Sequence, residues 1–206
     1  MLKRKLLTVW IILLFVGTCT IPAIAHNTEK TLPASRGWLY VGGSGPGNYS
    51  KIQDAVDNAS EGDTVFVFDE SSPYIENILI NTSLSLIGEN KETTIINGST
   101  NGSGENMTDY FGVWINADNV TVRGFTIQDC NLSALYILSN YTNITDTILS
   151  HNRAYGILLG STEPSPSPEM SGFHTITNNL IIHNTAGIWV SGQNNIIRGN
   201  VISYND

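Results

Sequence analysis

Aromatic side chains recur at one position of a repeated phrase, and they are the first residues here that could bind a ligand. Trp114, Tyr136, Leu158 and Trp189 each stand between two apolar residues. If each short apolar run is a β-strand, the flanking residues point inward and these four point outward. Exposed aromatic rings in a row suit stacking against the apolar C–H faces of sugars. We therefore assign Trp114, Tyr136 and Trp189 to a carbohydrate-binding face; burial of the stripe under a neighbouring insert is the alternative.

A carboxylate and two imidazoles recur at a second position of the phrase, followed there by a tyrosine. The residues are Asp129, His151, His183 and Tyr204. Two imidazoles and a carboxylate on neighbouring turns could hold a metal ion or act as an acid–base pair. Polar, solvent-exposed residues are also usual at such positions, and no further ligand is assigned beside these residues. Asp129, His151 and His183 are therefore weak catalytic candidates, and no metal site is assigned.

The phrase that places both sets recurs along residues 112–205. Its copies begin 22, 22 and 31 residues apart (134 − 112, 156 − 134, 187 − 156), at Gly112, Ala134, Gly156 and Gly187. A Pro/Ser-rich insert around 161–171 lengthens the last interval. Short runs of Val, Ile and Thr with Asn or Gly between them, at a period near 22, are typical of a solenoid. One unit cannot bury its own apolar face, whereas stacked units share a core.

These repeats predict an all-β fold, a right-handed parallel β-helix built as a single-stranded solenoid. Inward positions carry Ile, and Asn tolerates the left-handed conformation that corners require. We expect Asn152, Asn184 and Asn205 to stack as a ladder at one corner.

The pattern resembles the repeats of the pectin-lyase-like superfamily and, within it, the NosD-type domains, also described as carbohydrate-binding and sugar-hydrolase domains. Gly62-Asp63-Thr64-Val65 and Tyr74-Ile75-Glu76 are similar to the usual start of that fold. The resemblance implies the fold and a secreted or surface protein. It leaves activity open, because lyases, hydrolases, adhesins and non-enzymatic proteins share the fold.

Enzymes of the superfamily need clustered carboxylates, which bind Ca²⁺ in lyases and act as acid and base in hydrolases. Asp118, Asp129 and Asp146 fall at different phases of the coil and should not converge. A NosD-like chain could suggest copper, but His and Met are sparse. We assign no cofactor, and we expect Ca²⁺ only if the chain is a lyase. Whether the chain is an enzyme stays open, and a non-catalytic role is favoured.

The N-terminus reads as a signal peptide, residues 1–25. Lys3-Arg4-Lys5 precedes an apolar run over 6–16, and small residues stand at Ala23 and Ala25. Retention as an anchor is the alternative; after cleavage we expect no membrane span and a secreted or cell-surface location. A flexible segment, 26–37, then leads into the β-helix domain, 38–206.

A helix over about 50–60 is expected to cap the N-terminal end of the β-helix. Ile52, Ala55, Val56 and Ala59 form an apolar stripe. A capping box, with Ser50 as N-cap and Gln53 three residues later, would begin it. The regular coils span 112–206. Because no capping element follows them, we expect further coils or self-association at that end.

Charge excludes some partners. The full chain carries 10 Lys+Arg and 18 Asp+Glu, net −8; without the three basic residues of the leader this becomes 7 − 18 = −11. Such a chain is a poor partner for nucleic acid or anionic lipid. Among its Asn-x-Ser/Thr sequons, Asn101, Asn106 and Asn140 are glycosylation candidates.

The sequence therefore predicts an exported β-helix module that binds a polysaccharide or cell-surface glycan, or serves as a structural surface protein. A polysaccharide lyase or glycoside hydrolase is the first alternative. An adhesive solenoid that contacts other proteins is the second.

Overall fold

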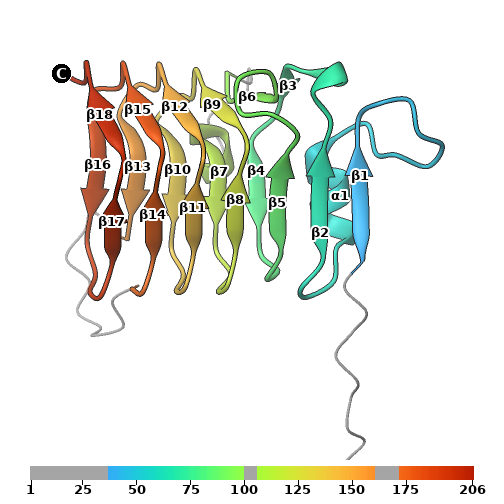
Figure 1. Cartoon of the computed structure of the whole chain (residues 1–206), viewed down its shortest axis with the longest axis horizontal. Helices are drawn as coiled ribbons and strands as arrows, with labels where there is room; N and C mark the ends of the chain where they lie inside the picture. The colour runs from blue at the N-terminus through green and yellow to red at the C-terminus, as the bar shows by residue number, and fades with distance from the viewer. Residues whose placement is uncertain (1–36, 100–105, 161–171) are drawn as a thin grey trace, which may run out of the picture. The chain divides into compact units, whose positions relative to one another are not determined.

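Short strands follow one another in groups of three, and each group makes one turn of a parallel β-helix (Figure 1). The computed structural model describes residues 37–99, 106–160 and 172–206, which belong to one compact unit, Leu32–Asp206. Each turn contributes strands to three parallel sheets, named A, B and C. The strand pairs within these sheets are parallel, which confirms the predicted fold class.

The sheets are built as follows. Sheet A contains β1 (Trp38–Val41), β2 (Thr64–Val67), β5 (Ser85–Gly88), β8 (Thr121–Arg123), β11 (Asn143–Thr145), β14 (Thr175–Thr177) and β17 (Ile196–Arg198). Sheet B contains β3 (Tyr74–Ile75), β6 (Ile95–Asn97), β9 (Thr126–Gln128), β12 (Ile148–Ser150), β15 (Leu180–Ile182) and β18 (Val201–Ser203). Sheet C contains β4 (Ile78–Ile80), β7 (Phe111–Ile115), β10 (Ser133–Ile137), β13 (Tyr155–Leu159) and β16 (Ala186–Val190). The helical elements are α1 (Ile52–Asn58), η1 (Asp69–Ser71) and η2 (Met107–Tyr110).

Rows of buried aliphatic side chains fill the interior. The register aligns Val65, Leu86, Val122, Ile144 and Ile176 across sheet A. It aligns Ile96, Ile127, Leu149 and Ile181 across sheet B. All are inaccessible to solvent. Each such side chain contributes on the order of 2 kcal/mol by leaving water, so the repeated inward residue holds the coils together.

From Asn119 onward, each turn has three corners, and each corner uses a residue in the left-handed conformation. Corner 1, before sheet A, has Asn119, Tyr141, Phe173 and Asn194; corner 2, between sheets A and B, has Gly124, Asp146, Asn178 and Gly199; corner 3, between sheets B and C, has Asp129, His151, His183 and Tyr204. Gly, Asn, Asp and His tolerate this conformation best. The side chains at these positions project away from the core.

The residue after each corner 3 position points inward and forms the predicted asparagine ladder. Oδ1 of Asn184 accepts from the backbone N–H of Asn152, and Oδ1 of Asn205 accepts from that of Asn184, at 3.1 and 3.0 Å. The side-chain amide of Asn184 donates to the carbonyl of Leu149 at 3.0 Å. The ladder satisfies buried backbone groups that the corner leaves without strand partners.

Helix α1 lies against the first turn, with Ile52, Ala55 and Val56 buried in the core. It begins two residues later than expected, and its N-cap position has no side-chain cap. The predicted capping box is therefore wrong. The carboxylate of Glu76 instead accepts the N–H groups of Ile52 and Gln53 at 2.9 and 3.0 Å. Because Glu76 is held by the strands of the first turn, the helix start is fixed to the sheet.

No helix within the described residues is long and apolar enough to cross a bilayer. The predicted signal peptide and flexible segment lie outside the described residues, apart from Gly37, as does the sequon at Asn101.

Candidate functional site

Corner 3 brings the predicted histidines together. His151 follows β12 and His183 follows β15, with φ of 58° and 55°, so both side chains leave the backbone in the same direction. Their rings are stacked, with centroids 5.1 Å apart and planes at 24°. The ring of Tyr204 stacks on His183 at 5.4 Å.

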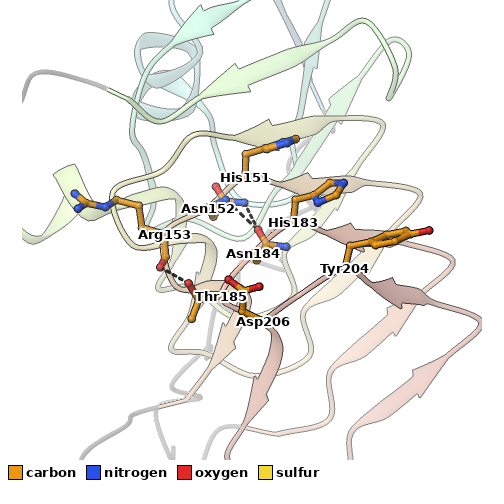
Figure 2. A pocket seen from close by; sticks show the side chains of 8 residues that line it. All are labelled: His151, Asn152, Arg153, His183, Asn184, Thr185, Tyr204 and Asp206. Carbon is orange, nitrogen blue, oxygen red and sulfur yellow. Dashed lines mark hydrogen bonds between the residues drawn. The ribbon is translucent and has the colours of Figure 1, made fainter.

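A cleft of about 370 Å³ runs along this corner (Figure 2). It is lined by His151, Asn152, Arg153, His183, Asn184, Thr185, Tyr204 and Asp206. In Figure 2 the three rings extend to one side, and the Arg153 side chain extends to the other. Asn152 and Asn184 are buried, and the hydroxyl of Thr185 donates to the carbonyl of Arg153 at 2.8 Å. The stacked rings of His151, His183 and Tyr204 therefore form one side of the cleft, and the amides of Asn152 and Asn184 and other polar groups form the rest of its lining.

Asp129 belongs to the same corner but not to the cleft. Its Oδ2 accepts from the side-chain amides of Asn97 and Gln128, at 2.8 and 2.9 Å. Asp118 instead accepts from the backbone N–H of Asn140, and Asp146 forms an ion pair with Lys91. The three carboxylates thus have separate partners. Within the described ranges, no three His, Cys, Asp or Glu side chains gather as a metal site.

The predicted aromatic stripe is in register on the outer face of sheet C. The aligned residues are Leu79, Trp114, Tyr136, Leu158 and Trp189. However, Tyr136 is only 9% exposed, and burial raises the pKa of its phenol. Phe111 stacks on Tyr136 at 4.4 Å, and both pack with Leu158 as a second hydrophobic cluster. The expectation of an exposed row is therefore wrong at Tyr136.

The two tryptophans of the stripe differ in how far their side chains are exposed to solvent. Trp189 is 44% exposed and meets Tyr155 edge to face at 6.0 Å. Trp114 is partly buried against the second cluster, and its indole N–H has no hydrogen-bond partner among the described residues. Trp189 is therefore the member of the stripe whose ring is most accessible to a ligand.

A surface that sequence reasoning missed is the outer face of sheet A. Trp38 and Tyr40 on β1 are 55% and 42% exposed. Their rings contact Phe66 at 6.2 and 6.3 Å, and Phe68 lies 6.0 Å from Tyr40. Tyr40 and Phe68 also line a hollow of about 260 Å³ with Gly43, Ser44, Gly45, Asn48 and Glu70. We name Trp38, Tyr40, Phe66 and Phe68 the aromatic platform.

Mostly polar side chains continue from the aromatic platform along sheet A in two rows, which also contain the apolar Ile87, 8% exposed, and Ile196. The first row is Trp38, Thr64, Ser85, Thr121, Asn143, Thr175 and Ile196; the second is Tyr40, Phe66, Ile87, Arg123, Thr145, Thr177 and Arg198. Arg123 and Arg198 are exposed, and neither has an ion-pair partner among the residues that the structure describes. The face therefore combines rings, hydroxyls, an amide and two guanidinium groups.

Two further rings border this face at corner 1. Tyr141 and Phe173 are about half exposed and stack at 5.1 Å. Both have positive φ, 56° and 61°, a conformation that is unusual for bulky side chains. Each stands two residues before an outward residue of sheet A, Asn143 or Thr175.

The remaining sequon candidates differ in access. Asn106 is exposed. Asn140 is half-buried, its Oδ1 accepts from the N–H of Gly172, and its amide donates to Asp118. A side-chain amide that is already hydrogen-bonded is a poor site for glycan attachment. Of these two sequons, Asn106 is therefore the better glycosylation candidate.

The fold and surfaces define a parallel β-helix protein. Residues 56–206 match the family described as periplasmic copper-binding protein (NosD), and the chain belongs to this family. No curated protein matches the chain.

Two solved structures are similar. A pectin methylesterase in complex with a hexasaccharide superposes with a TM-score of 0.52 at 16% identity, covering 73% of this chain and 53% of that one. A pectin methylesterase from carrot gives a TM-score of 0.48 at 16% identity, with 73% and 63% covered. This chain thus spans about half the length of the first. At this identity the likeness supports the shared fold alone.

Proposed function

We propose that this chain is an exported β-helix module that binds a polysaccharide along the outer face of sheet A. The observation that carries the proposal is the in-register continuation of the aromatic platform into rows of hydroxyl, amide and guanidinium groups. The flat faces of sugar rings stack on aromatic side chains, and their hydroxyls pair with polar groups.

The dimensions of the face suit an extended polymer. Parallel strands lie about 4.8 Å apart, so the six intervals from β1 to β17 span about 29 Å. A linear glycan could cross the strands from the aromatic platform toward Arg198, with several sugar units in contact. The stacked rings of Tyr141 and Phe173 border the middle of this path.

The hollow beside the aromatic platform supplies polar groups for one sugar unit. Glu70 and Ser44 line it together with Tyr40 and Phe68. A carboxylate accepts hydrogen bonds from sugar hydroxyls, while the rings contact the apolar ring face.

The family match supports the export part of this proposal, because the family is described as periplasmic. The similar structures support the β-helix fold alone. Trp189 on sheet C remains a second candidate contact, because its ring is exposed. Tyr136 is dropped from the proposed binding residues because it is buried.

The test is retention of the full chain in native gels cast with neutral and acidic polysaccharides. We expect slower migration with at least one polymer, and loss of that retention in the Trp38→Ala/Tyr40→Ala variant. Trp189→Ala, which removes the second candidate contact, distinguishes the two faces: it should keep the retention if sheet A is the binding face.

Two outcomes would contradict the proposal. If no polymer retains the chain, polysaccharide binding is refuted. If only Trp189→Ala loses the retention, the binding face is on sheet C and not on sheet A. Release of reducing ends from a retained polymer would favour the lyase or hydrolase alternative over a pure binding module.

A further inference from the structure

Two bulky rings occupy corner 1, where the coils before and after them carry asparagine. The left-handed residues of this corner are Asn119, Tyr141, Phe173 and Asn194. The side chains of Tyr141 and Phe173 are about half exposed, and their rings stack with centroids 5.1 Å apart and planes inclined by 19°. Together they present one exposed apolar surface that spans two coils beside sheet A.

The backbone conformation of these two residues is one that aromatic residues rarely adopt. φ is 56° at Tyr141 and 61° at Phe173. Asparagine tolerates this left-handed conformation, as at Asn119 and Asn194, whereas a bulky residue there is unfavourable for folding. Strained positions of this kind are concentrated at functional sites. The two rings therefore indicate a role other than stability.

Hydrogen bonds between coils hold the backbone beneath both rings. The N–H of Tyr141 donates to the carbonyl of Gly172 at 3.1 Å, and the N–H of Phe173 donates to the carbonyl of Gln193 at 3.0 Å. The coils approach so closely here that a Cβ at Gly172 would clash with the carbonyl oxygen of Gln193. Because this backbone is fixed, the rings are in position before a ligand binds, and little conformational freedom is lost on binding.

The stacked pair lies several coils away from the aromatic platform along the same sheet (Figure 1). From β2, which carries Phe66, to β11, which begins two residues after Tyr141, there are three strand intervals, or about 14 Å. The hydroxyls of Ser85 and Thr121, both partly exposed, lie in the row between. One sugar ring cannot cover both aromatic surfaces. An extended glycan can stack on each and place its hydroxyls against the polar row.

We propose that Tyr141 and Phe173 form a second stacking site for the glycan, and that the chain thereby selects extended polysaccharides over short oligosaccharides. This inference rests on the proposed binding along sheet A. A glycan that already occupies the aromatic platform reaches the second site intramolecularly, at a high effective concentration. A short oligosaccharide makes only one of the two contacts. Affinity therefore rises steeply at the chain length that first spans both sites.

The test begins with native gels that contain neutral hydroxyethylcellulose or acidic polygalacturonate. Oligosaccharides of increasing length, made by hydrolysis of the polymer that retains the chain, are then titrated by calorimetry. The test variant is Tyr141→Asn/Phe173→Asn, because asparagine already occupies this corner in two other coils. All proteins are made in a host that does not glycosylate asparagine, since Phe173→Asn creates an Asn-x-Thr sequon that ends at Thr175.

The matched control is Tyr204→Asn, which makes the same change at a left-handed position of corner 3, away from sheet A. Tyr204 has a φ of 55°, is exposed and stacks on a neighbouring ring, as the residues of the pair do. Tyr204→Asn should bind oligosaccharides of every length as the parent does.

We expect the affinity of the parent to increase at least about tenfold between oligosaccharides that reach one site and those that span both. In Tyr141→Asn/Phe173→Asn this increase should be lost, while the shortest oligosaccharides bind as they do to the parent. The melting temperature of this variant should not fall, because asparagine tolerates the backbone conformation better than the rings do.

The outcomes separate this inference from the proposed function. If the test variant keeps the parent's length dependence, binding on sheet A stands and the second stacking site is refuted. If neither polymer nor any of their oligosaccharides binds the parent, both proposals fail. A lower melting temperature with unchanged binding would make the rings structural. A parent dimer that dissociates in the test variant, measured by sedimentation with unchanged glycan binding, would assign the rings to a contact between two copies.

Discussion

Oδ1 of Asn184 accepts two hydrogen bonds from Asn152, one from its backbone N–H at 3.1 Å and one from its side-chain amide at 2.8 Å. Both asparagines are 3% exposed. The amide of Asn184 donates in turn to the carbonyls of Leu149 and Ile182. One side chain therefore satisfies polar groups on its own coil and on the coil before it.

Replacing that side chain should be costly. In Asn184→Ala, the N–H of Asn152 and the carbonyl of Leu149 each lose a hydrogen bond inside the core. Each unsatisfied buried group costs about 1–3 kcal/mol, so we expect the free energy of unfolding to fall by roughly 3 kcal/mol. The free energy of unfolding of both proteins is measured by urea denaturation. Thr185→Ala, one residue further on and exposed, is the control and should cost less than about 1 kcal/mol; equal losses would refute the role of the ladder.

The carboxylate of Glu76 should determine the stability of the start of α1. Glu76→Ala removes the acceptor of the Ile52 and Gln53 N–H groups, which we expect to cost about 2 kcal/mol. Amide hydrogen exchange at Ile52 and Gln53 should become faster than in the parent. Glu61→Ala, an exposed carboxylate beyond the helix, should leave that exchange unchanged. Unchanged protection in Glu76→Ala would show that another group caps the helix.

His174 should make the fold sensitive to mild acid. Burial, the largest effect, lowers the pKa of His174, although the charge of Asp118 opposes the shift. Its Nδ1 accepts the N–H of Thr142 at 3.2 Å, so protonation would place two donors face to face. Because the folded pKa lies below the unfolded one, near 6.5, stability is complete above that pH and falls as pH drops toward the folded pKa.

The test compares the urea midpoint of the parent and of His174→Asn between pH 7.5 and 5. Asn195 follows the corner 1 residue of the next coil and carries no charge, so Asn should fit this position. The parent should lose stability across this range more steeply than the variant. Parallel curves would show that His174 does not contribute to the acid sensitivity.

Cys130 should be inert in the folded protein. It is fully buried, and burial raises the pKa of its thiol to about 12. Compared with an ordinary thiol of pKa 9.0, the thiolate fraction at pH 8 falls about a thousandfold. Labelling by a thiol reagent, followed by mass spectrometry of the peptide that contains Cys130, should be slow until urea unfolds the chain. Rapid labelling without urea would contradict the burial of this corner.

The fold could be predicted from the sequence, because the repeat encodes it locally. Alternating apolar residues at a period near 22 specify strands with one buried face, and only stacking of equivalent positions can bury that face. The Asn152–Asn184–Asn205 ladder, the grouping of His151 with His183 and the alignment of Trp114 with Tyr136 all followed from that register.

Which of these outward positions solvent can reach depends on tertiary packing. Tyr136 is covered because Phe111 stacks on it, a contact between neighbouring strands that the repeat period does not encode. Glu76 caps α1 from 24 residues away in the chain. The aromatic platform joins Trp38 to Phe66 across an intervening helix, before the regular repeats begin. Such contacts depend on how side chains pack between distant segments, whereas periodicity reports only the side of the strand on which a residue lies.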